Sequence, residues 1–283
     1  MRSPSQPSIP QAATAVDPED CSSLLLPLFR SLTELAPSCV VWKNTDMALS
    51  GVGDVDCMAP QVIWSSIIAQ VRLWASEAEL GPVIVCNHVP DGMFVIALNG
   101  TDEFFQLDVR SRVSFRGSAV FRAEDLAHLA QMDRRGFRRL RPGAEGLLKL
   151  VLKGIAWGGR PRLEKLRSEG VVGLIDQDIV GVRQAAELFK PVSNALVSAA
   201  ESFRDGRWDS RTMLALEVVC CLKALTHPQV ALGRARSRAR GAARCPVVEA
   251  SIKGSRRLPA DDYTSWLSRV SEFHPVFDSD AAP

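Results

Sequence analysis

The spacing of apolar residues changes along this 283-residue chain, and that change limits the folds open to it. Up to about residue 120, apolar residues occur in short runs separated by turn-forming residues, which is typical of β-strands. Beyond that point they recur every three or four positions, which predicts amphipathic helices. The order predicts an α+β protein, with a small mixed β-sheet and flanking helices followed by a mainly helical C-terminal domain.

The same spacing divides the chain into three predicted parts. Residues 1–21 are rich in Ser, Pro, Gln and Ala and bury too little apolar surface to offset the entropy lost on ordering, so we expect a flexible tail. Residues 22–140 carry the strand-like runs and form the predicted N-terminal domain. Residues 141–283 carry the helical periodicity and form the predicted helical domain.

Turn-forming residues set the expected order of elements. A leading helix is expected to follow Ser22, with Pro27 limiting its first turn. Two strands joined by a loop come next, and Pro60 suits the start of a helix after them. Three further strands are expected, of which the last two form a hairpin or meander, and helices follow. The expected strands are CVVW (39–42), VDCMA (55–59), PVIVCN (82–87), MFVIALNG (93–100) and FFQLDV (104–109); the later helices are AEDLAHLAQM, PGAEGLLKLVLKGIAW, VRQAAELFKPVSNALVSAAESF and SRTMLALEVVCCLKAL.

Composition argues against several classes of protein. The net charge of +2 argues against a surface shaped throughout for nucleic acid. The seven cysteines show no C-x-x-C pair and no zinc-ligand spacing, which is typical of free thiols in a reducing compartment. No apolar run has the length of a signal peptide core or a membrane span. The sequence therefore predicts a cytoplasmic protein that does not contact a membrane.

An acidic pair lies at the start of the second expected strand. Asp54 and Asp56 are two residues apart, so their side chains point to one face of the strand. Two carboxylates so close together repel each other unless a cation or a proton offsets their charge. Oxygen ligands of this kind suit Mg²⁺ or Mn²⁺. The pair is therefore a predicted metal site.

A third carboxylate interrupts an otherwise apolar strand. Asp108 lies within FFQLDV, where a lone carboxylate facing a core would carry a large desolvation cost. If this strand lies beside the strand of Asp56, three carboxylates meet at one edge of the sheet. Such a cluster holds the two metal ions that phosphoryl and nucleotidyl transfer use. We therefore predict Asp54, Asp56 and Asp108 as metal ligands and catalytic residues.

Four short motifs follow one another along the chain: Val41-Trp42-Lys43-Asn44, Gly53-Asp54-Val55-Asp56, Leu107-Asp108-Val109 and Arg116-Gly117. With this order, residues 38–160 resemble the nucleotidyltransferase superfamily, which has the polymerase-beta-like nucleotidyltransferase fold. The nearest resemblance is to the nucleotidyltransferase-like proteins of bacterial biosynthetic clusters. The resemblance implies an enzyme that moves a nucleoside monophosphate from an NTP such as ATP to a small-molecule acceptor, releasing pyrophosphate, with Mg²⁺ or Mn²⁺ as cofactor.

The resemblance also implies residues that bind the nucleotide phosphates. Gly53 belongs to the acidic motif, and Lys43 and Asn44 stand where the superfamily has Gly-Ser or Gly-Gly after the first strand. The small residues of that turn let backbone N–H groups approach the triphosphate. Here Lys43 and Asn44 are expected to reach it through their side chains. Lys149 and Lys153 lie four apart in a predicted helix, where they share a face that contacts either phosphate or solvent.

Two other interpretations remain open. The altered turn leaves room for a catalytically altered binding or scaffold protein of the same fold. A toxin that transfers nucleotides to tRNA is the second, and its RNA contact would be residues 234–244, which begin with Arg234 and end with Arg244. A solvated or disordered loop is the simpler explanation of this basic run, because the run lacks interleaved aromatic residues and the net charge is small.

Other arginines are interpreted as surface residues. Arg110, Arg112 and Arg116 follow the strand of Asp108, where contact with the substrate is the alternative, but arginines after a strand are commonly exposed. The arginine cluster within residues 134–141 has the same interpretation.

Overall fold

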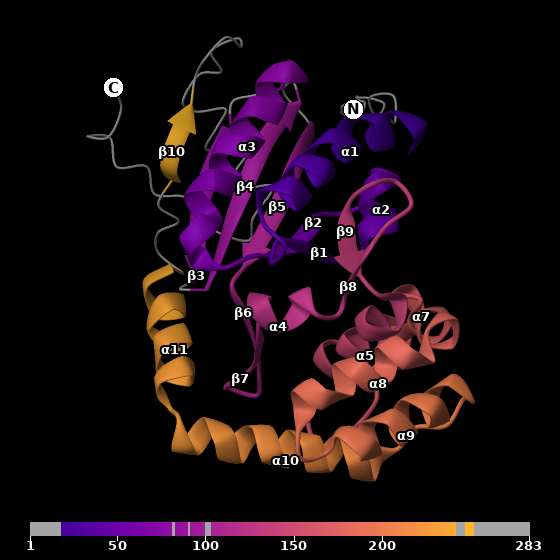
Figure 1. The fold of residues 1–283 in the computed structure, drawn as a ribbon. Coiled ribbons are helices and arrows are strands. Elements are labelled where there is room, and N and C mark those ends of the chain that lie inside the picture. Colours follow the sequence, from indigo (N-terminus) through magenta and orange to yellow (C-terminus); the bar gives the residue numbers. More distant parts are fainter. Residues whose placement is uncertain (1–17, 81–82, 90, 100–102, 242–246, 252–283) are drawn as a thin grey trace, which may run out of the picture.

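A computed structural model describes residues 18–80, 83–89, 91–99, 103–241 and 247–251 (Figure 1). Within these ranges the protein has an α+β fold, as the sequence predicts. The main β-sheet lies in the upper half of Figure 1, and most of the later helices gather below it. No helix in the described ranges is both long enough and apolar enough to cross a membrane.

The elements follow the predicted order in outline. The strands are β1 (Val40–Lys43), β2 (Val55–Met58), β3 (Val83–Val89), β4 (Gly92–Asn99), β5 (Glu103–Arg110), β6 (Arg112–Phe115), β7 (Ser118–Arg122), β8 (Ala130–Met132), β9 (Arg138–Leu140) and β10 (Val247–Ser251). The α-helices are α1 (Pro18–Leu35), α2 (Thr45–Leu49), α3 (Trp64–Glu77), α4 (Ala123–Ala127), α5 (Pro142–Leu152), α6 (Leu163–Ser168), α7 (Val171–Gln177), α8 (Ile179–Ala186), α9 (Ser193–Arg204), α10 (Ser210–Thr226) and α11 (Gln229–Gly241). The short 3₁₀ helices are η1 (Gln61–Ile63) and η2 (Glu187–Phe189).

The main sheet joins eight of the described strands in the order β10-β3-β4-β5-β2-β1-β9-β8. Strands β4 and β5 form the predicted antiparallel hairpin, and β3 extends it to a three-stranded meander. Strand β5 then lies parallel to β2, and β2 lies antiparallel to β1. A parallel neighbour requires a crossover connection, which α3, β3 and β4 supply here. The topology therefore brings the strand of Asp56 beside the strand of Asp108.

One face of the sheet packs against α1 and α3. Alternate strand residues point to this face, including Val41 of β1 and Cys57 of β2, and they share a core with Phe29 of α1. All three side chains are buried. Because side chains alternate along a strand, Asp56 and Asp108 point to the opposite face.

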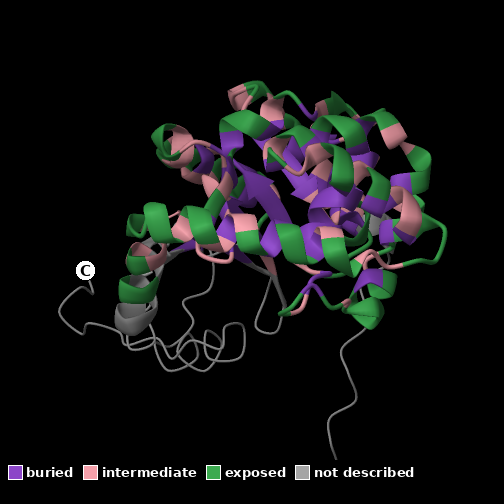
Figure 2. Cartoon of the chain, turned by 90° about the horizontal axis from the view of Figure 1, so that it is seen from below, coloured by how far each residue is buried: buried purple, intermediate pink, exposed green. Residues whose placement is uncertain are grey.

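The opposite face of the sheet meets a second core. Trp42 and Met58 pack there with α5, in which Leu147 and Leu148 are fully buried. Phe121 of β7 joins the same core. Figure 2 shows the buried residues gathered inside, with exposed residues along the outer faces of the helices. This core draws on residues before and after position 140, and the limits of the two domains remain a prediction.

The structure differs from the expected elements in several places. The loop between β1 and β2 contains the short helix α2, which begins directly after Asn44. The helix expected over AEDLAHLAQM is limited to α4 and ends at Ala127, and its last three residues form β8. Because β8 pairs with β9, strand pairing overrides the helical spacing of this segment.

The β6–β7 hairpin is a further element that the sequence analysis did not predict. Its turn consists of Arg116 and Gly117, which both adopt positive φ angles, 50° and 83°. Two successive positive φ angles are typical of a type I′ turn, where Asn-Gly or Gly-Gly is usual. Arginine in the first position conceals this turn in the sequence, because a non-glycine residue rarely adopts positive φ.

The leading helix is confirmed and begins earlier than predicted. Helix α1 starts at Pro18, inside the segment predicted to be a tail, and it continues through Pro27. The remainder of that tail, residues 1–17, lies outside the described residues.

Gly143 marks a close contact between the start of α5 and the residue ahead of α8. A Cβ atom added at Gly143 would lie 1.7 Å from the carbonyl oxygen of Asp178, so the backbone would have to move. We expect Gly143→Ala to lower the free energy of unfolding by about 2 kcal/mol. The control is Gly173→Ala in α7, where a Cβ meets no atom within 4 Å and the change is expected to be neutral or stabilising. Urea unfolding measures both, and equal stabilities would contradict this prediction.

Candidate active site

Two parallel strands bring Asp56 and Asp108 side by side. Asp56 of β2 pairs in register with Asp108 of β5. Both residues are buried, with 4% and 6% of their surface exposed. Adjacent strands are about 4.8 Å apart, so the two carboxylates repel each other across the sheet. The condition that the sequence analysis set for a shared site, that these two strands be neighbours, is met.

Asp54 lies on the same face but outside the buried pair. It is exposed in the loop ahead of β2, where its Oδ2 is 3.5 Å from Nε2 of Gln106. Gln106 precedes Asp108 by two residues on β5, so Asp54 is displaced from the pair by one repeat of the strand. Among the residues that the structure describes, no three Asp, Glu, His or Cys side chains form a ready metal site. The predicted convergence of three carboxylates is therefore incomplete.

Lys43 neutralises Asp56. Its Nζ lies 2.6 Å from Oδ1 of Asp56, and the side chains are only 16% and 6% exposed. Burial raises the pKa of Asp56 to about 6; the Lys43 ammonium opposes this rise, whereas the neighbouring Asp108 carboxylate adds to it. Lys43, predicted to contact phosphate, therefore contacts a predicted metal ligand instead.

Arg110 neutralises Asp108 in a similar way. Its Nη2 lies 2.9 Å from Oδ2 of Asp108, and its Nε lies 3.1 and 3.3 Å from the two carboxylate oxygens. Burial lowers the pKa of Arg110, but the Asp108 carboxylate outweighs burial, so that the pKa is raised. The interpretation of Arg110 as a plain surface residue is wrong. Residues two apart on a strand share a face, and that spacing places Arg110 beside Asp108.

Lys149 and Lys153 approach the site from α5. Nζ of Lys149 lies 2.8 Å from Glu145 and 3.3 Å from Glu169, and all three side chains are buried. Lys153 directly follows α5, and its Nζ lies 2.5 Å from Glu169. Burial lowers the pKa of Lys153, although Glu169 favours its charged form. The two lysines therefore converge on one region, and each has an acidic partner there.

A single carboxylate, that of Glu145, ties the turn after β1 to α5. Asn44 adopts a left-handed conformation with φ of 56° and precedes α2. Its backbone N–H donates to Oε1 of Glu145 at 2.9 Å, the same oxygen that Lys149 contacts. The side-chain Oδ1 of Asn44 is buried and has no hydrogen-bond partner in the described part of the chain. The turn expected to meet phosphate therefore meets a carboxylate of the protein.

Gly53 shapes the loop ahead of the acidic pair. Its φ angle is 83°, in the left-handed region that favours glycine, while a Cβ atom there would meet nothing within 4 Å. The backbone conformation, and not a lack of space, requires glycine at this position. The expected contact of Gly53 with nucleotide stays a prediction.

A cavity of about 190 Å³ lies between the sheet and α5. Four cations line it: Lys43, Arg110, Lys149 and Lys153. Its other walls are the mainly apolar side chains of Trp42, Val113, Ser114, Phe115, Leu148 and Leu152. The indole N–H of Trp42 is buried without a hydrogen-bond partner among the described residues. This combination suits an anion that also carries an apolar or hydrogen-bonding group.

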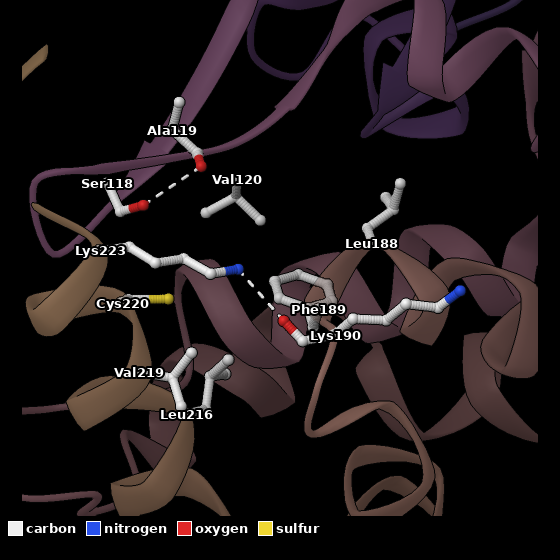
Figure 3. Close-up of a pocket in the computed structure, with 10 residues that line it drawn as sticks. All are labelled: Ser118, Ala119, Val120, Leu188, Phe189, Lys190, Leu216, Val219, Cys220 and Lys223. Atoms are coloured by element: carbon white, nitrogen blue, oxygen red, sulfur yellow. Dashed lines mark hydrogen bonds between the residues drawn. The ribbon is translucent and has the colours of Figure 1, made fainter. Parts of the chain in front are cut away.

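A second cavity lies between β7, η2 and α10 (Figure 3). Its volume of about 20 Å³ has room for about one water molecule. Nζ of Lys223 donates to the carbonyl oxygen of Lys190 at 3.1 Å, and the hydroxyl of Ser118 donates to the carbonyl oxygen of Ala119 at 3.3 Å. The polar groups of this cavity are therefore engaged with each other or with backbone, and the larger cavity is the candidate site.

Most of the other basic residues considered above lie away from the cavity. Arg139 is the exception: it is buried and its Nη2 lies 3.5 Å from Oε2 of Glu145, so the surface interpretation is wrong for this residue. Arg112 pairs with Asp91 at 2.7 Å, and Arg116 pairs with Glu217 at 2.6 Å. Further ion pairs join Arg135 and Arg139 to Asp46 and Asp133, and Arg141 to Asp178. Residues 234–241 belong to α11, so the expected loop is wrong for this part, and the rest of the basic stretch up to 244 lies outside the described residues. Its contact with RNA stays a prediction.

Sequence analysis missed two acidic residues of the site, Glu145 and Glu169. Glu145 precedes Lys149 by four residues in a predicted helix, a spacing that favours an ion pair and was a usable signal. Glu169 is sixteen residues from Lys153, and only the path of the chain after α5 brings the two together.

Comparison of this chain with family models, with curated proteins and with solved structures found no match. The resemblance to the nucleotidyltransferase superfamily therefore stays a prediction from the sequence motifs.

The raised pKa of Asp56 makes the stability of the protein depend on pH. Because its pKa moves from 3.8 to about 6 on folding, the folded state holds the proton more tightly than the unfolded state does. The stabilisation from protonated Asp56 is fully present below about pH 4 and is lost as the pH rises through 6. A shift of this size corresponds to about 3 kcal/mol.

Asp56→Asn removes this titration. Relative to wild type, the variant should gain about 3 kcal/mol in unfolding free energy between about pH 4 and pH 7. The control is Asp205→Asn, since Asp205 is exposed and pairs with Arg204 at the surface. Urea unfolding across this range measures the difference; if it stays constant with pH for Asp56→Asn, the prediction is wrong.

Proposed function

We propose that this protein is a metal-dependent nucleotidyltransferase, which transfers a nucleoside monophosphate from an NTP to a small-molecule acceptor and releases pyrophosphate. One observation carries the proposal: Asp56 pairs in register with Asp108 directly beside two of the cations that line the larger cavity. Adjacent carboxylates and cations suit a substrate that brings both a divalent metal and phosphate groups. The order of strand, turn, Asp-x-Asp and later strand Asp supports the same reaction.

The chemistry of the carboxylates fits a hard divalent metal. Mg²⁺ and Mn²⁺ prefer oxygen ligands, and Asp56 and Asp108 supply them from neighbouring strands, with Asp54 one strand repeat away. These three residues would hold the metal. When bound, a divalent metal neutralises phosphate oxygens and makes an attacking hydroxyl more acidic.

The residues around the carboxylates have separate roles in the proposed reaction. Lys43, Lys149 and Lys153 line the cavity and would bind the phosphates and offset their charge. Asp108 would accept the proton that the acceptor loses as it attacks the α-phosphate. Trp42 offers a buried N–H group that has no partner within the described residues, which a ligand in the cavity would satisfy.

A second candidate function is a binding or scaffold protein that does not catalyse transfer. One observation favours it: Lys43 and Arg110 already neutralise Asp56 and Asp108. Calorimetry separates the two candidates, because the enzyme should bind an NTP only with Mg²⁺ or Mn²⁺, whereas a scaffold should show no metal-linked nucleotide binding. For either function we propose a cytoplasmic location, in keeping with free thiols such as that of Cys39.

Removal of one central carboxylate tests the transferase. Wild-type protein supplied with Mg²⁺ and cell extract as a source of acceptor should release pyrophosphate from at least one of the four NTPs. Asp56→Asn should lower that rate by about a hundredfold or more, because a direct metal ligand is lost. Asp205→Asn is the matched control and should retain the rate.

Circular dichroism should show that Asp56→Asn remains folded. A folded Asp56→Asn variant that releases pyrophosphate at the wild-type rate would remove the proposed role of this carboxylate. Absence of pyrophosphate release from wild type under every condition would favour the scaffold.

A further inference from the structure

The ion pair between Lys43 and Asp56 has a consequence for how ligands enter the site, and this consequence rests on the proposed function. We propose that Lys43 occupies the place of a divalent metal at Asp56, so that metal binds there only when nucleotide phosphates draw Lys43 away. Metal and nucleotide then enter the site together, and metal alone binds weakly.

A divalent metal and the Lys43 ammonium compete for the same carboxylate. Nζ of Lys43 lies 2.6 Å from Oδ1 of Asp56. Mg²⁺ binds carboxylate oxygens at about 2.0–2.1 Å, which would bring the two cations close together. Their repulsion is strong because Asp56 is only 4% exposed and little water screens the charges. Lys43 must therefore move before a metal takes its place.

The other carboxylates do not offer the metal an easier position. Arg110 contacts both oxygens of Asp108. Its guanidinium group stays charged at any physiological pH, so this contact is not relieved by loss of a proton. Asp54 is exposed and stands apart from the buried pair. A single exposed carboxylate holds a divalent metal weakly, because affinity rises with the number of charged ligands.

Lys43 is the lysine of the cavity that is best placed to leave its partner. Lys149 is held by Glu145 and Glu169, and Lys153 is held by Glu169. Within the described residues, the one ion-pair partner of Lys43 is Asp56. Lys43 also lines the cavity and keeps 16% of its side chain exposed, so a short rotation of its flexible stem reaches the cavity.

Phosphate groups in the cavity supply what Lys43 loses when it leaves Asp56. The ammonium exchanges one anionic partner for another, and the freed carboxylate accepts the metal that accompanies the phosphates. Neither exchange leaves a buried charge without a partner, which would be costly. By thermodynamic linkage, nucleotide raises the affinity for metal, and metal raises the affinity for nucleotide by the same factor.

Binding of Mn²⁺ to the full-length protein, followed by electron paramagnetic resonance of the free ion, tests this inference. Wild type should bind Mn²⁺ weakly alone and at least tenfold more tightly with α,β-methylene-ATP, an analogue that is not cleaved. Lys43→Met should bind Mn²⁺ at least tenfold more tightly than wild type without any nucleotide. Lys190→Met, a change at an exposed lysine paired with Glu187, is the control and should behave as wild type.

Two results would overturn the inference. One is equal or weaker binding of Mn²⁺ alone by Lys43→Met than by wild type. The other is wild-type binding of Mn²⁺ that is as tight without the nucleotide analogue as with it, a measurement that needs no variant. The double variant Lys43→Met/Asp56→Asn should bind Mn²⁺ no more tightly than wild type does. If it still binds Mn²⁺ as tightly as Lys43→Met, the metal binds at another site, which counts against the proposal.

Thermal unfolding provides a second measurement for a weakened variant. In Lys43→Met the buried Asp56 lacks its partner, so Mn²⁺ should raise the melting temperature of this variant, and of Lys43→Gln, but not that of wild type. If the melting temperatures of both variants do not change when Mn²⁺ is added, the inference is also overturned. Pyrophosphate release by wild type is measured separately. If Lys43→Met binds Mn²⁺ tightly but wild type releases no pyrophosphate, the transferase is rejected and this inference stands. If wild type releases pyrophosphate but Lys43→Met binds Mn²⁺ no more tightly than wild type does, only this inference is rejected.

Discussion

Two buried carboxylates side by side impose the main constraint on this protein. The parallel pairing of β2 with β5 puts Asp56 beside Asp108, and burial makes their charge costly unless a cation lies close to each. Lys43 and Arg110 meet that requirement. The Lys43–Asp56 pair therefore joins β1 to β2 by charge as well as by strand pairing, whereas Arg110 and Asp108 neutralise each other within β5.

The same alternation of charge continues from the sheet into the helices. Glu145 accepts a hydrogen bond from the backbone N–H of Asn44 and pairs with Lys149, while Glu169 pairs with Lys149 and Lys153. Buried ion pairs of this kind contribute little net stability, because desolvation opposes their attraction. Removing one partner is nevertheless costly, because the other charge is then buried without a partner. Their effect here is to hold the turn after β1 and the end of α5 around one cavity.

A site in which each cation already has an acidic partner selects its ligands by charge balance. A free anion satisfies the lysines but leaves the carboxylates without their partners, and a free metal does the reverse. A ligand that brings phosphate and metal together can replace both kinds of internal contact at once. This property links the proposed transferase to the observed ion pairs.

Local patterns in the sequence determined the strands β1 to β5, most of the helices and the two-residue spacing that puts Asp56 and Met58 on one strand face, because periodicity and turn chemistry act over a few residues. Only the tertiary structure decided that Lys43 pairs with Asp56, that Lys153 pairs with Glu169, and that Asp54 is exposed. Ion-pair partners and strand neighbours depend on which distant segments meet, and the β8–β9 pairing shows the same dependence by overriding a helical pattern. The sequence alone thus supplied the charged groups of this site, and the fold determined which of them neutralise one another.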